Sequence, residues 1–423
     1  MSEASERALK REIHGKAHEV LVLPAPGWSD VLVREIESVL KSLCLPAKFQ
    51  PHLTQQDDAC LVQNIDFRNL IELPCRLQTA ADIRWILRSR HVGSFGEFNT
   101  FLQQMPWELY VPNQARVQCK VESYRSKLFH EGKLAEQIEA LLQAKGYACV
   151  NENPDIRLHF LQIENRHQLA LSVTKDPLYH RHYKTQLRHR APLQEHLAAS
   201  ALQWFFQLPQ QKTWLPDLVY VPFAGSGTLW VETLLYRDHI PLNNWRSELG
   251  LEVWPAFPAA SWGTLQKRLQ ALSTINSSSC PSLLLDLDPE LVEQLKLQVH
   301  RIQSEGQLCF PQLSVTVQAG DFFERPWPES SVQPFIPINP PYGIRLEHAA
   351  ADGESAKKFY VRLCQHLRSG LARFPGARGF VLVPDGDAYA GARESLGSEY
   401  TLGMQSFSQG GQHIRCLAFG RAT

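Results

Sequence analysis

One stretch decides the fold of this 423-residue chain, namely Leu218-Val219-Tyr220-Val221-Pro222-Phe223-Ala224-Gly225-Ser226-Gly227-Thr228. Its apolar first half predicts a short buried strand, its glycine-rich second half a tight turn, and residues 229–236 a helix. Strand, glycine turn and helix together form a nucleotide-type site, because glycines let a ligand approach the backbone and a helix N-terminus offers free N–H groups. An ordinary strand–helix turn is the alternative for this stretch taken alone.

The glycine turn differs from two common phosphate-binding motifs. No lysine follows Gly227, so the turn is not a P-loop. Trp230 occupies the third-glycine position of a dinucleotide fingerprint, where it would hinder close packing over a pyrophosphate. A Gly-x-Gly turn without these features suits a smaller adenosyl ligand. We therefore predict cofactor contacts from Pro222, Phe223, Gly225, Ser226, Gly227 and Thr228.

A second strand ends in a carboxylate. The apolar run 283–285 leads to Asp286, which we expect to accept hydrogen bonds from both ribose hydroxyls. Asp288 precedes Pro289 and is expected to cap the helix that begins there. The alternative is that both acids only cap and solvate the strand end.

A third strand, at 315–318, leads to an acidic and aromatic turn. We predict that Asp321 accepts from an adenine amine and that Phe322 packs against the ring. An ordinary turn aspartate is the alternative.

The turn Asn339-Pro340-Pro341-Tyr342 follows the run 332–338 and carries the predicted chemistry. Two prolines remove two backbone donors and fix φ, so neither a helix nor a central strand continues through them. The Asn339 side-chain oxygen and the Pro340 carbonyl can accept both hydrogens of a planar amine, while Tyr342 stacks on the ring that carries it. We predict all four as catalytic residues; the alternative is a proline-stiffened surface turn.

These four features share a position in the predicted fold. Each lies at the carboxyl end of a strand, where ligands bind in open α/β sheets. Their order is glycine turn, ribose acid, adenine acid and proline turn. That order is typical of class I S-adenosylmethionine-dependent methyltransferases that act on an amine.

Composition sets limits on the function. Lys plus Arg and Asp plus Glu both number 43, so nucleic-acid contacts must come from local basic patches. The nine cysteines contain no Cys-x-x-Cys pair, so we expect reduced thiols and no metal site. The N-terminus is polar and no apolar run approaches ~18 residues, so we expect a cytoplasmic protein without a membrane span.

Residues 1–175 mix strands and helices and predict a small α+β region. We expect strands at 18–23, 59–62, 81–88, 116–121, 157–162 and 168–173, and helices at 29–42, 95–104 and 133–145.

A basic segment with interleaved Tyr179 and Tyr183 follows the α+β region, and a helix is predicted at 192–206. Cations and aromatic rings together suit RNA backbone and base contacts. A solvated linker is the alternative, and three histidines there lack the acids or cysteines of a metal site. Arg125 and Lys127 form a second, smaller basic patch. The predicted RNA contacts of the main segment are Arg181, Lys184, Arg188 and Arg190.

The motifs resemble the THUMP-domain RNA guanine-N2 methyltransferases, especially the bacterial large-subunit rRNA guanine-N2 methyltransferase and its shorter relatives. The resemblance covers most of 15–420 and is strongest from 175 to 346. It is carried by Ala191-Pro192-Leu193-Gln194-Glu195, Pro222 to Thr228, Asp286-Leu287-Asp288-Pro289 and Asn339-Pro340-Pro341-Tyr342-Gly343-Ile344-Arg345-Leu346.

The resemblance implies an α/β fold with a Rossmann-like class I methyltransferase domain, preceded by an α+β ferredoxin-like and THUMP region. The implied domains are 15–175 for RNA binding, 176–210 as a basic linker and helix, and 211–423 for methyl transfer, with an insertion at about 240–280 that contains Trp254 and Trp262. The implied activity is methylation of a guanine N2 amine in rRNA, with tRNA also open. S-adenosylmethionine is the implied cofactor, and neither a metal nor a membrane is a partner.

Two departures from the family pattern leave alternatives open. Val221 stands where the family usually has an acid that would meet the methionine ammonium. The strand before Asn339 contains Gln333, Pro334 and Pro337, which predicts an irregular strand. The alternatives are an adenine-N6 methyltransferase acting on DNA or RNA, or an RNA-binding protein whose cofactor site has decayed.

Overall fold

Two compact units make up the computed structural model, and neither is one continuous stretch of chain. The first comprises residues 1–24, 32–180 and 245–269, and the second 25–31, 181–244 and 270–423. The structure describes residues 3–46, 48–56, 59–163, 165–181, 183, 193–211, 214–242, 250–275, 280–304, 313–327, 332–341 and 355–421.

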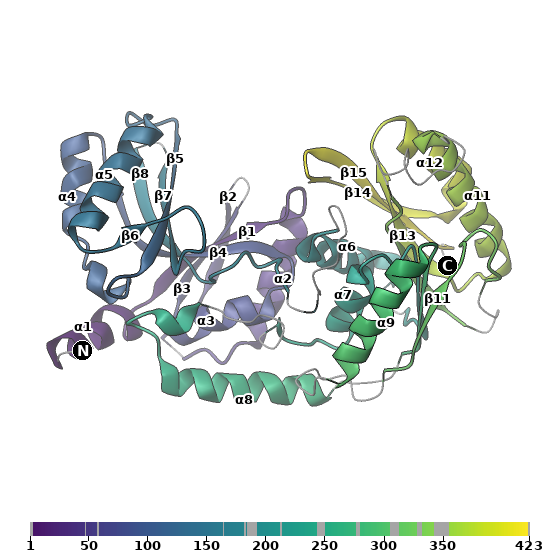
Figure 1. Cartoon of the computed structure of the whole chain (residues 1–423), viewed down its shortest axis with the longest axis horizontal. Helices are drawn as coiled ribbons and strands as arrows, with labels where there is room; N and C mark the ends of the chain where they lie inside the picture. The colour runs from purple at the N-terminus through teal and green to yellow at the C-terminus, as the bar shows by residue number, and fades with distance from the viewer. Residues whose placement is uncertain are drawn as a thin grey trace. The chain divides into compact units, whose positions relative to one another are not determined.

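The first unit is built on an eight-stranded sheet with the order β2-β3-β1-β4-β8-β7-β5-β6 (Figure 1). All neighbours are antiparallel except that β5 runs parallel to β6 and β7. The strands are β1 (His18–Pro24), β2 (His52–Gln56), β3 (Ala59–Ile65), β4 (Ala80–His91), β5 (Arg116–Tyr124), β6 (Ala148–Cys149), β7 (Ile156–Ile163) and β8 (Arg166–Ser172).

The helices of the N-terminal half are α1 (Glu3–Leu9), α2 (Ser29–Ser42), α3 (Phe67–Arg76), α4 (Phe95–Gln103) and α5 (Glu131–Ala144). The strand and helix predictions for this half are confirmed, with ends that shift by a few residues. Helix α3 was missed because Pro74 lies inside it. The Asp66 carboxylate caps α3 by accepting from the backbone N–H groups of Arg68 and Asn69.

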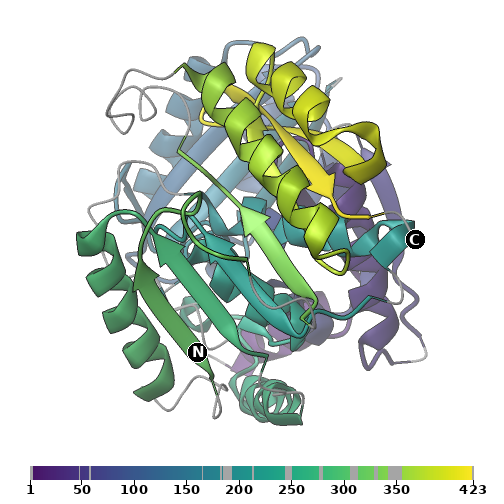
Figure 2. The ribbon, with the colours of Figure 1, turned by 90° about the vertical axis from the view of Figure 1, so that its right-hand side faces the viewer.

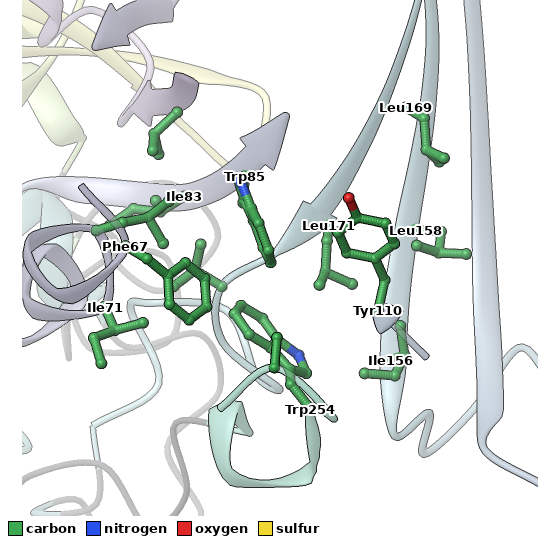
Figure 3. Close-up of a cluster of buried hydrophobic side chains, with 14 of the residues drawn as sticks. Phe67, Ile71, Ile83, Trp85, Tyr110, Ile156, Leu158, Leu169, Leu171 and Trp254 are labelled. Carbon is green, nitrogen blue, oxygen red and sulfur yellow. The ribbon is translucent and has the colours of Figure 1, made fainter. Parts of the chain in front are cut away.

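The insertion predicted within the methyltransferase domain contributes to the core of the first unit. Its 3₁₀ turn (Leu251–Val253) leads to Trp254, whose ring lies 5.5 Å from Trp85 and 6.3 Å from Phe67 (Figure 3). The following helix, α8 (Ala259–Ile275), carries Arg268, which pairs with the buried Glu72 of α3. Residues 250–269 therefore belong structurally with the N-terminal half.

A short N-terminal segment belongs instead to the second unit. Trp28 is 1% exposed and packs 5.2 Å from Phe407 and 6.3 Å from Trp204, measured between ring centroids. Gly27 has φ +85°, and a Cβ there would lie 2.6 Å from the Ser406 carbonyl oxygen. Only glycine fits this close approach.

The second unit contains a seven-stranded sheet with the order β11-β10-β9-β12-β13-β15-β14. The five neighbouring strands β11, β10, β9, β12 and β13 run parallel, and β15 runs antiparallel to both β13 and β14. The strands are β9 (Leu218–Pro222), β10 (Ser282–Asp286), β11 (Val315–Ala319), β12 (Pro334–Ile338), β13 (Arg378–Pro384), β14 (Thr401–Gln409) and β15 (Gln412–Phe419).

Helices pack against this sheet. Figure 2 shows α9 beside β10 and β11. It also shows α11 and α12 next to each other, beside the strands of the C-terminal half. The helices are α6 (Glu195–Gln207), α7 (Thr228–Arg237), α9 (Pro289–Ser304), α11 (Ala356–Arg373) and α12 (Asp387–Leu396). This is the Rossmann-like α/β architecture predicted from the sequence.

The chain order creates a switch point between β9 and β12. From β9 the chain builds outward through β10 and β11, then returns to the other side of β9 with β12. Strands β9 and β12 are paired over only two residues, Leu218 with Pro334 and Val219 with Phe335. Pro337, which has no N–H to donate, stands beyond the point where this pairing stops. Ligands bind in α/β sheets at such a point, outside the carboxyl ends of the strands.

The expectation of an irregular strand before Asn339 is wrong. Strand β12 pairs in continuous parallel register with β13 from Phe335 to Ile338, and all five of its residues are buried. Its prolines are accommodated because Pro334 is the first residue of the strand, and Pro337 lies where only β13 remains as a partner. In the part of the chain that the structure describes, no helix is both long and apolar enough to span a bilayer.

Replacement of Trp254 by alanine tests whether the insertion is integral to the first unit. Trp254 is 4% exposed, so Trp254→Ala should lower stability by about 3–5 kcal/mol through loss of buried area and creation of a cavity. Urea unfolding of the full chain measures the change. The adjacent Val253 is 46% exposed, and Val253→Ala is the control, with an expected change within about 0.5 kcal/mol. Equal shifts for the two variants would contradict an integral role.

Candidate active site

A cavity of about 600 Å³ lies at the carboxyl ends of β9, β10, β11 and β12. Its volume is within the range of ordinary ligand sites, roughly 300–1,000 Å³. The glycine turn, both predicted acids and the proline turn all line it. From the predicted set, the lining residues are Phe223, Gly225, Ser226, Thr228, Asp286, Asp321, Phe322, Asn339, Pro340 and Pro341.

The glycine turn has the backbone conformation that its sequence requires. Gly225 and Gly227 have φ +51° and +72°, in the left-handed region. A Cβ at Gly227 would lie 2.7 Å from Leu295 Cδ1 on α9, so the close packing of this turn also needs glycine. Phe223 has φ +57°, a strained conformation for an aromatic residue. Such strain is typical of functional turns that the surrounding structure holds in place.

The Asp286 carboxylate fixes the glycine turn. Its Oδ2 accepts from the Gly225 N–H at 2.7 Å, and its Oδ1 accepts from the Asp288 N–H at 3.1 Å. A carboxylate has about four acceptor sites, so capacity remains for ligand hydroxyls. Asp288 accepts from the Glu290 N–H at 2.9 Å, which confirms the predicted helix cap.

The third turn forms the aromatic wall of the cavity. Asp321 Oδ1 accepts from the Phe323 N–H at 2.9 Å, which fixes the backbone beside the cavity. Phe322 is only 3% exposed, and its ring packs 4.8 Å from His366 of α11. Burial lowers the pKa of His366, while the negative charge of Asp321 partly opposes this shift.

Helix α11 supplies site residues that the sequence analysis missed. Phe359 and Arg362 both line the cavity, and the Arg362 guanidinium carbon lies 3.9 Å from the centre of the Phe323 ring. This helix begins beyond the proline turn and contains no recognisable motif. Nothing in the local sequence indicates that it reaches the site.

The proline turn presents an acceptor without a partner. Asn339 Oδ1 is buried, and no hydrogen-bond donor reaches it from the residues that the structure describes. An unsatisfied buried amide oxygen costs about 1–3 kcal/mol, and a donor on a ligand in the cavity would remove that cost. Tyr342, the fourth predicted member of this turn, lies outside the described residues.

Arg181 occupies a different position from the one predicted. It is 3% exposed and forms a buried ion pair with Glu232 of α7, whose other oxygen accepts from the Tyr183 hydroxyl at 2.6 Å. Burial raises the pKa of Tyr183 well above its ordinary value. A buried guanidinium cannot reach an RNA phosphate, so the prediction of Arg181 as an RNA contact is wrong. The basic pattern of its neighbours obscured this anchoring role.

Other predicted residues are only partly tested. Lys184, Arg188 and Arg190 lie outside the described residues. Pro222 and Gly227 do not line the cavity; Pro222 ends β9, and Gly227 serves packing against α9. Val221 is 1% exposed within β9 and is likewise absent from the cavity lining.

No cluster of three or more His, Cys, Asp or Glu side chains suited to a metal occurs within the described ranges. The polar groups around the cavity are carboxylates, hydroxyls, backbone amides, one side-chain amide and the Arg362 guanidinium. Together with the strand order, this site defines a class I methyltransferase.

Residues 181–380 match the model of a protein family described as the RMKL-like methyltransferase domain. A candidate RNA methyltransferase of Synechocystis sp. (slr0064) is 26% identical over 288 residues, which are 66% of this chain and 68% of the relative. The ribosomal RNA large subunit methyltransferase K/L of Pseudomonas savastanoi is 27% identical over 237 residues, which are 55% of this chain but only 30% of that longer relative.

A solved structure shows the same fold over nearly the whole chain. The candidate methyltransferase SMU.472, complexed with SAH, superposes with a TM-score of 0.72 at 16% identity. The match covers 96% of this chain and 99% of that one.

The Arg181–Glu232 pair generates a stability prediction. Glu232→Ala leaves a buried guanidinium without its counterion and should cost about 3–5 kcal/mol in urea unfolding. The double variant Arg181→Met, Glu232→Leu removes both charges and should recover part of that loss, since the Tyr183 hydroxyl still loses the Glu232 oxygen that it donates to. If Glu232→Ala unfolds at the wild-type urea concentration, the pair does not anchor this segment.

Proposed function

We propose that the protein is an S-adenosylmethionine-dependent RNA methyltransferase that methylates the exocyclic N2 amine of a guanine, in rRNA or else in tRNA. The observation that carries the proposal is the buried Asn339 Oδ1 in the wall of the cavity, which has no hydrogen-bond partner among the described residues. Its position suits an acceptor for an amine hydrogen. The relatives named as RNA and ribosomal RNA methyltransferases support RNA as the substrate class.

The cavity residues fit S-adenosylmethionine. Gly225 and Ser226 would hold the methionine moiety at the N-terminus of α7, and the free acceptor sites of Asp286 would receive the ribose hydroxyls. Asp321 would accept from the adenine amine, with Phe322 and Phe323 forming the wall of that subsite. The SAH in the SMU.472 structure, which shares the fold, supports this choice of cofactor.

Apolar Val221 is compatible with this arrangement. It lies buried in β9, and the described acids of the cavity are Asp286, Asp288 and Asp321. The methionine ammonium would therefore be held by backbone carbonyls of the glycine turn, without an acid at position 221.

When bound, the cofactor supplies a methyl group on a positively charged sulfur atom. The target guanine must leave its stack to enter the cavity, because an amine inside a helix cannot reach it. Asn339 Oδ1 and the Pro340 carbonyl would each accept one amine hydrogen, and Tyr342 would stack on the base. These contacts fix the direction of the nitrogen lone pair. Their contribution is orientation and dipole placement, and the excess proton can pass to water after transfer.

We further propose that the N-terminal region is a THUMP-containing RNA-binding region, as the sequence resemblance implies. Lys184, Arg188 and Arg190 remain proposed RNA contacts. Their segment begins directly after Tyr183, which the Glu232 contact fixes to α7.

Replacement of Asn339 tests its role as the amine acceptor. Asn339→Ala should lower methyl transfer by about 100-fold or more, because a positioned dipole is lost, while cofactor affinity stays close to wild type. Single-turnover transfer and isothermal titration measure the two quantities separately. The control is Asn64→Ala, which removes a side-chain amide near the end of β3 in the first unit. There Asn64 Nδ2 donates to the Gln50 carbonyl, and this variant should retain full methyl transfer. Undiminished turnover by Asn339→Ala would remove this residue from the mechanism.

Methyl incorporation into RNA and DNA separates the alternatives. We expect labelled methyl groups in RNA, recovered as N2-methylguanosine after digestion to nucleosides. Label in N6-methyladenosine or N6-methyldeoxyadenosine would instead support the adenine alternative, since the same turn can hold an adenine amine. RNA binding with no incorporation and no cofactor binding would support a decayed site.

A further inference from the structure

The loop at residues 124–130, between β5 and α5, exposes two aromatic rings. Tyr124 is 58% exposed and Phe129 is 65% exposed. They are the two aromatic residues among the large, exposed apolar side chains of the described chain. Apolar rings held in water at two points of one short loop are characteristic of a binding surface.

The 124–130 loop is held rigidly from beneath. Asn165, in the β7–β8 turn with φ +64°, accepts from the Lys127 N–H at 2.7 Å and donates its own N–H to Ser126 Oγ at 2.9 Å. Ser123 Oγ donates to the Leu128 carbonyl at 2.6 Å, and the Leu128 side chain is only 5% exposed. The rings are therefore presented by a fixed backbone, which reduces the entropy lost on binding.

Basic side chains lie beside these rings. The Arg125 guanidinium carbon lies 4.9 Å from the centre of the Tyr124 ring, and the His130 ring lies 4.1 Å from that of Phe129. Lys127 is exposed between them. Stacked guanidinium and aromatic planes are surfaces on which nucleobases also stack.

Further basic residues surround the turn that supports the loop. Arg166 follows Asn165 directly and pairs in the sheet with His91, next to Arg90; all three are exposed. The Asn165 carbonyl accepts from the Val92 N–H at 2.7 Å, which ties this end of β4 to the same turn. The cations therefore come from three segments that Asn165 holds together.

The described acids nearby are engaged in local structure. Glu131 accepts from the Ser123 N–H at 2.8 Å, and Glu97 accepts from the Gly93 N–H at 2.7 Å. Glu122, which is exposed on β5, lies 3.9 Å from Arg84. The 124–130 loop itself contains two cations and no acid.

We propose that the 124–130 loop is a stacking platform for unpaired bases of the RNA substrate, separate from the cavity in which methyl transfer takes place. This inference rests on the proposed function for the identity of the substrate. Tyr124 and Phe129 each stack on one base, while Arg125, Lys127 and Arg166 contact neighbouring phosphates. The platform selects single-stranded RNA, because bases paired in an A-form helix do not offer their faces to side chains.

Binding to a short single-stranded oligoribonucleotide tests the platform, with a hairpin duplex of the same composition as the comparison. Base–aromatic stacking is worth roughly 1–3 kcal/mol per base, so Tyr124→Ala with Phe129→Ala should weaken single-strand binding by about 30-fold or more. Fluorescence anisotropy of the full chain measures this affinity. Hairpin binding should change less, and its salt dependence should remain.

Matched variants distinguish stacking from general loss of surface. Phe129→Tyr should retain affinity and Phe129→Leu should lose it, because leucine is apolar but has no ring face. Leu297→Ala removes a 70% exposed apolar side chain from α9 and should have no effect. Urea unfolding verifies that the double variant retains wild-type stability, as expected for two exposed side chains.

Cofactor titration separates this inference from the proposed function. Weakened single-strand binding in the double variant, with unchanged S-adenosylmethionine affinity, supports the platform. Wild-type RNA affinity in the double variant, or an equal loss in Leu297→Ala, overturns it while leaving the methyltransferase proposal intact. A wild-type protein that neither binds S-adenosylmethionine nor methylates RNA would overturn the proposed function itself.

Discussion

The hydrogen bond from the Gly225 N–H to the Asp286 carboxylate is the contact on which the cavity depends. It joins the turn after β9 to the end of β10, so that two strand ends act as one wall. The same carboxylate accepts from Asp288 and thereby positions the start of α9. Leu295 of α9 in turn leaves no room for a side chain at Gly227. One carboxylate therefore organises the glycine turn, the next strand end and the helix packed behind them.

The opposite wall follows from a different constraint. Strand β12 is held by β13 along its length but by β9 at only two residue pairs, so the strands at the switch point are not paired near their carboxyl ends. The proline turn stands at this opening and has few backbone donors of its own. Asn339 Oδ1 is consequently left without a partner among the described residues. A buried acceptor in this state, in the wall of a cavity, is available to a ligand donor.

The sequence predicted those site residues that stand at the end of a recognisable strand. Gly225, Asp286, Asp321 and Asn339 each follow a recognisable strand, and parallel strands bring their carboxyl ends to one edge of the sheet. The contributions of Phe359 and Arg362 were not predictable, because they depend on where α11 packs and not on a local motif. The prediction of Arg181 as an RNA contact failed for a related reason. A cation in a basic segment resembles its exposed neighbours, and only the tertiary partner Glu232 shows that it is buried. The sequence also carries no periodic pattern that would place residues 25–31 in the second unit and 245–269 in the first.

The central claim is that the strand ends of β9 to β12 form a binding site for S-adenosylmethionine although Val221 replaces an acid. Isothermal titration of the purified, full-length chain with S-adenosylmethionine tests it most directly. The account predicts one binding site of about micromolar affinity, equivalent to roughly −8 kcal/mol. Asp286→Ala, which removes the carboxylate shared by the turn and the ribose subsite, should abolish detectable binding. A folded wild-type protein that shows no binding, with or without RNA present, would contradict the account.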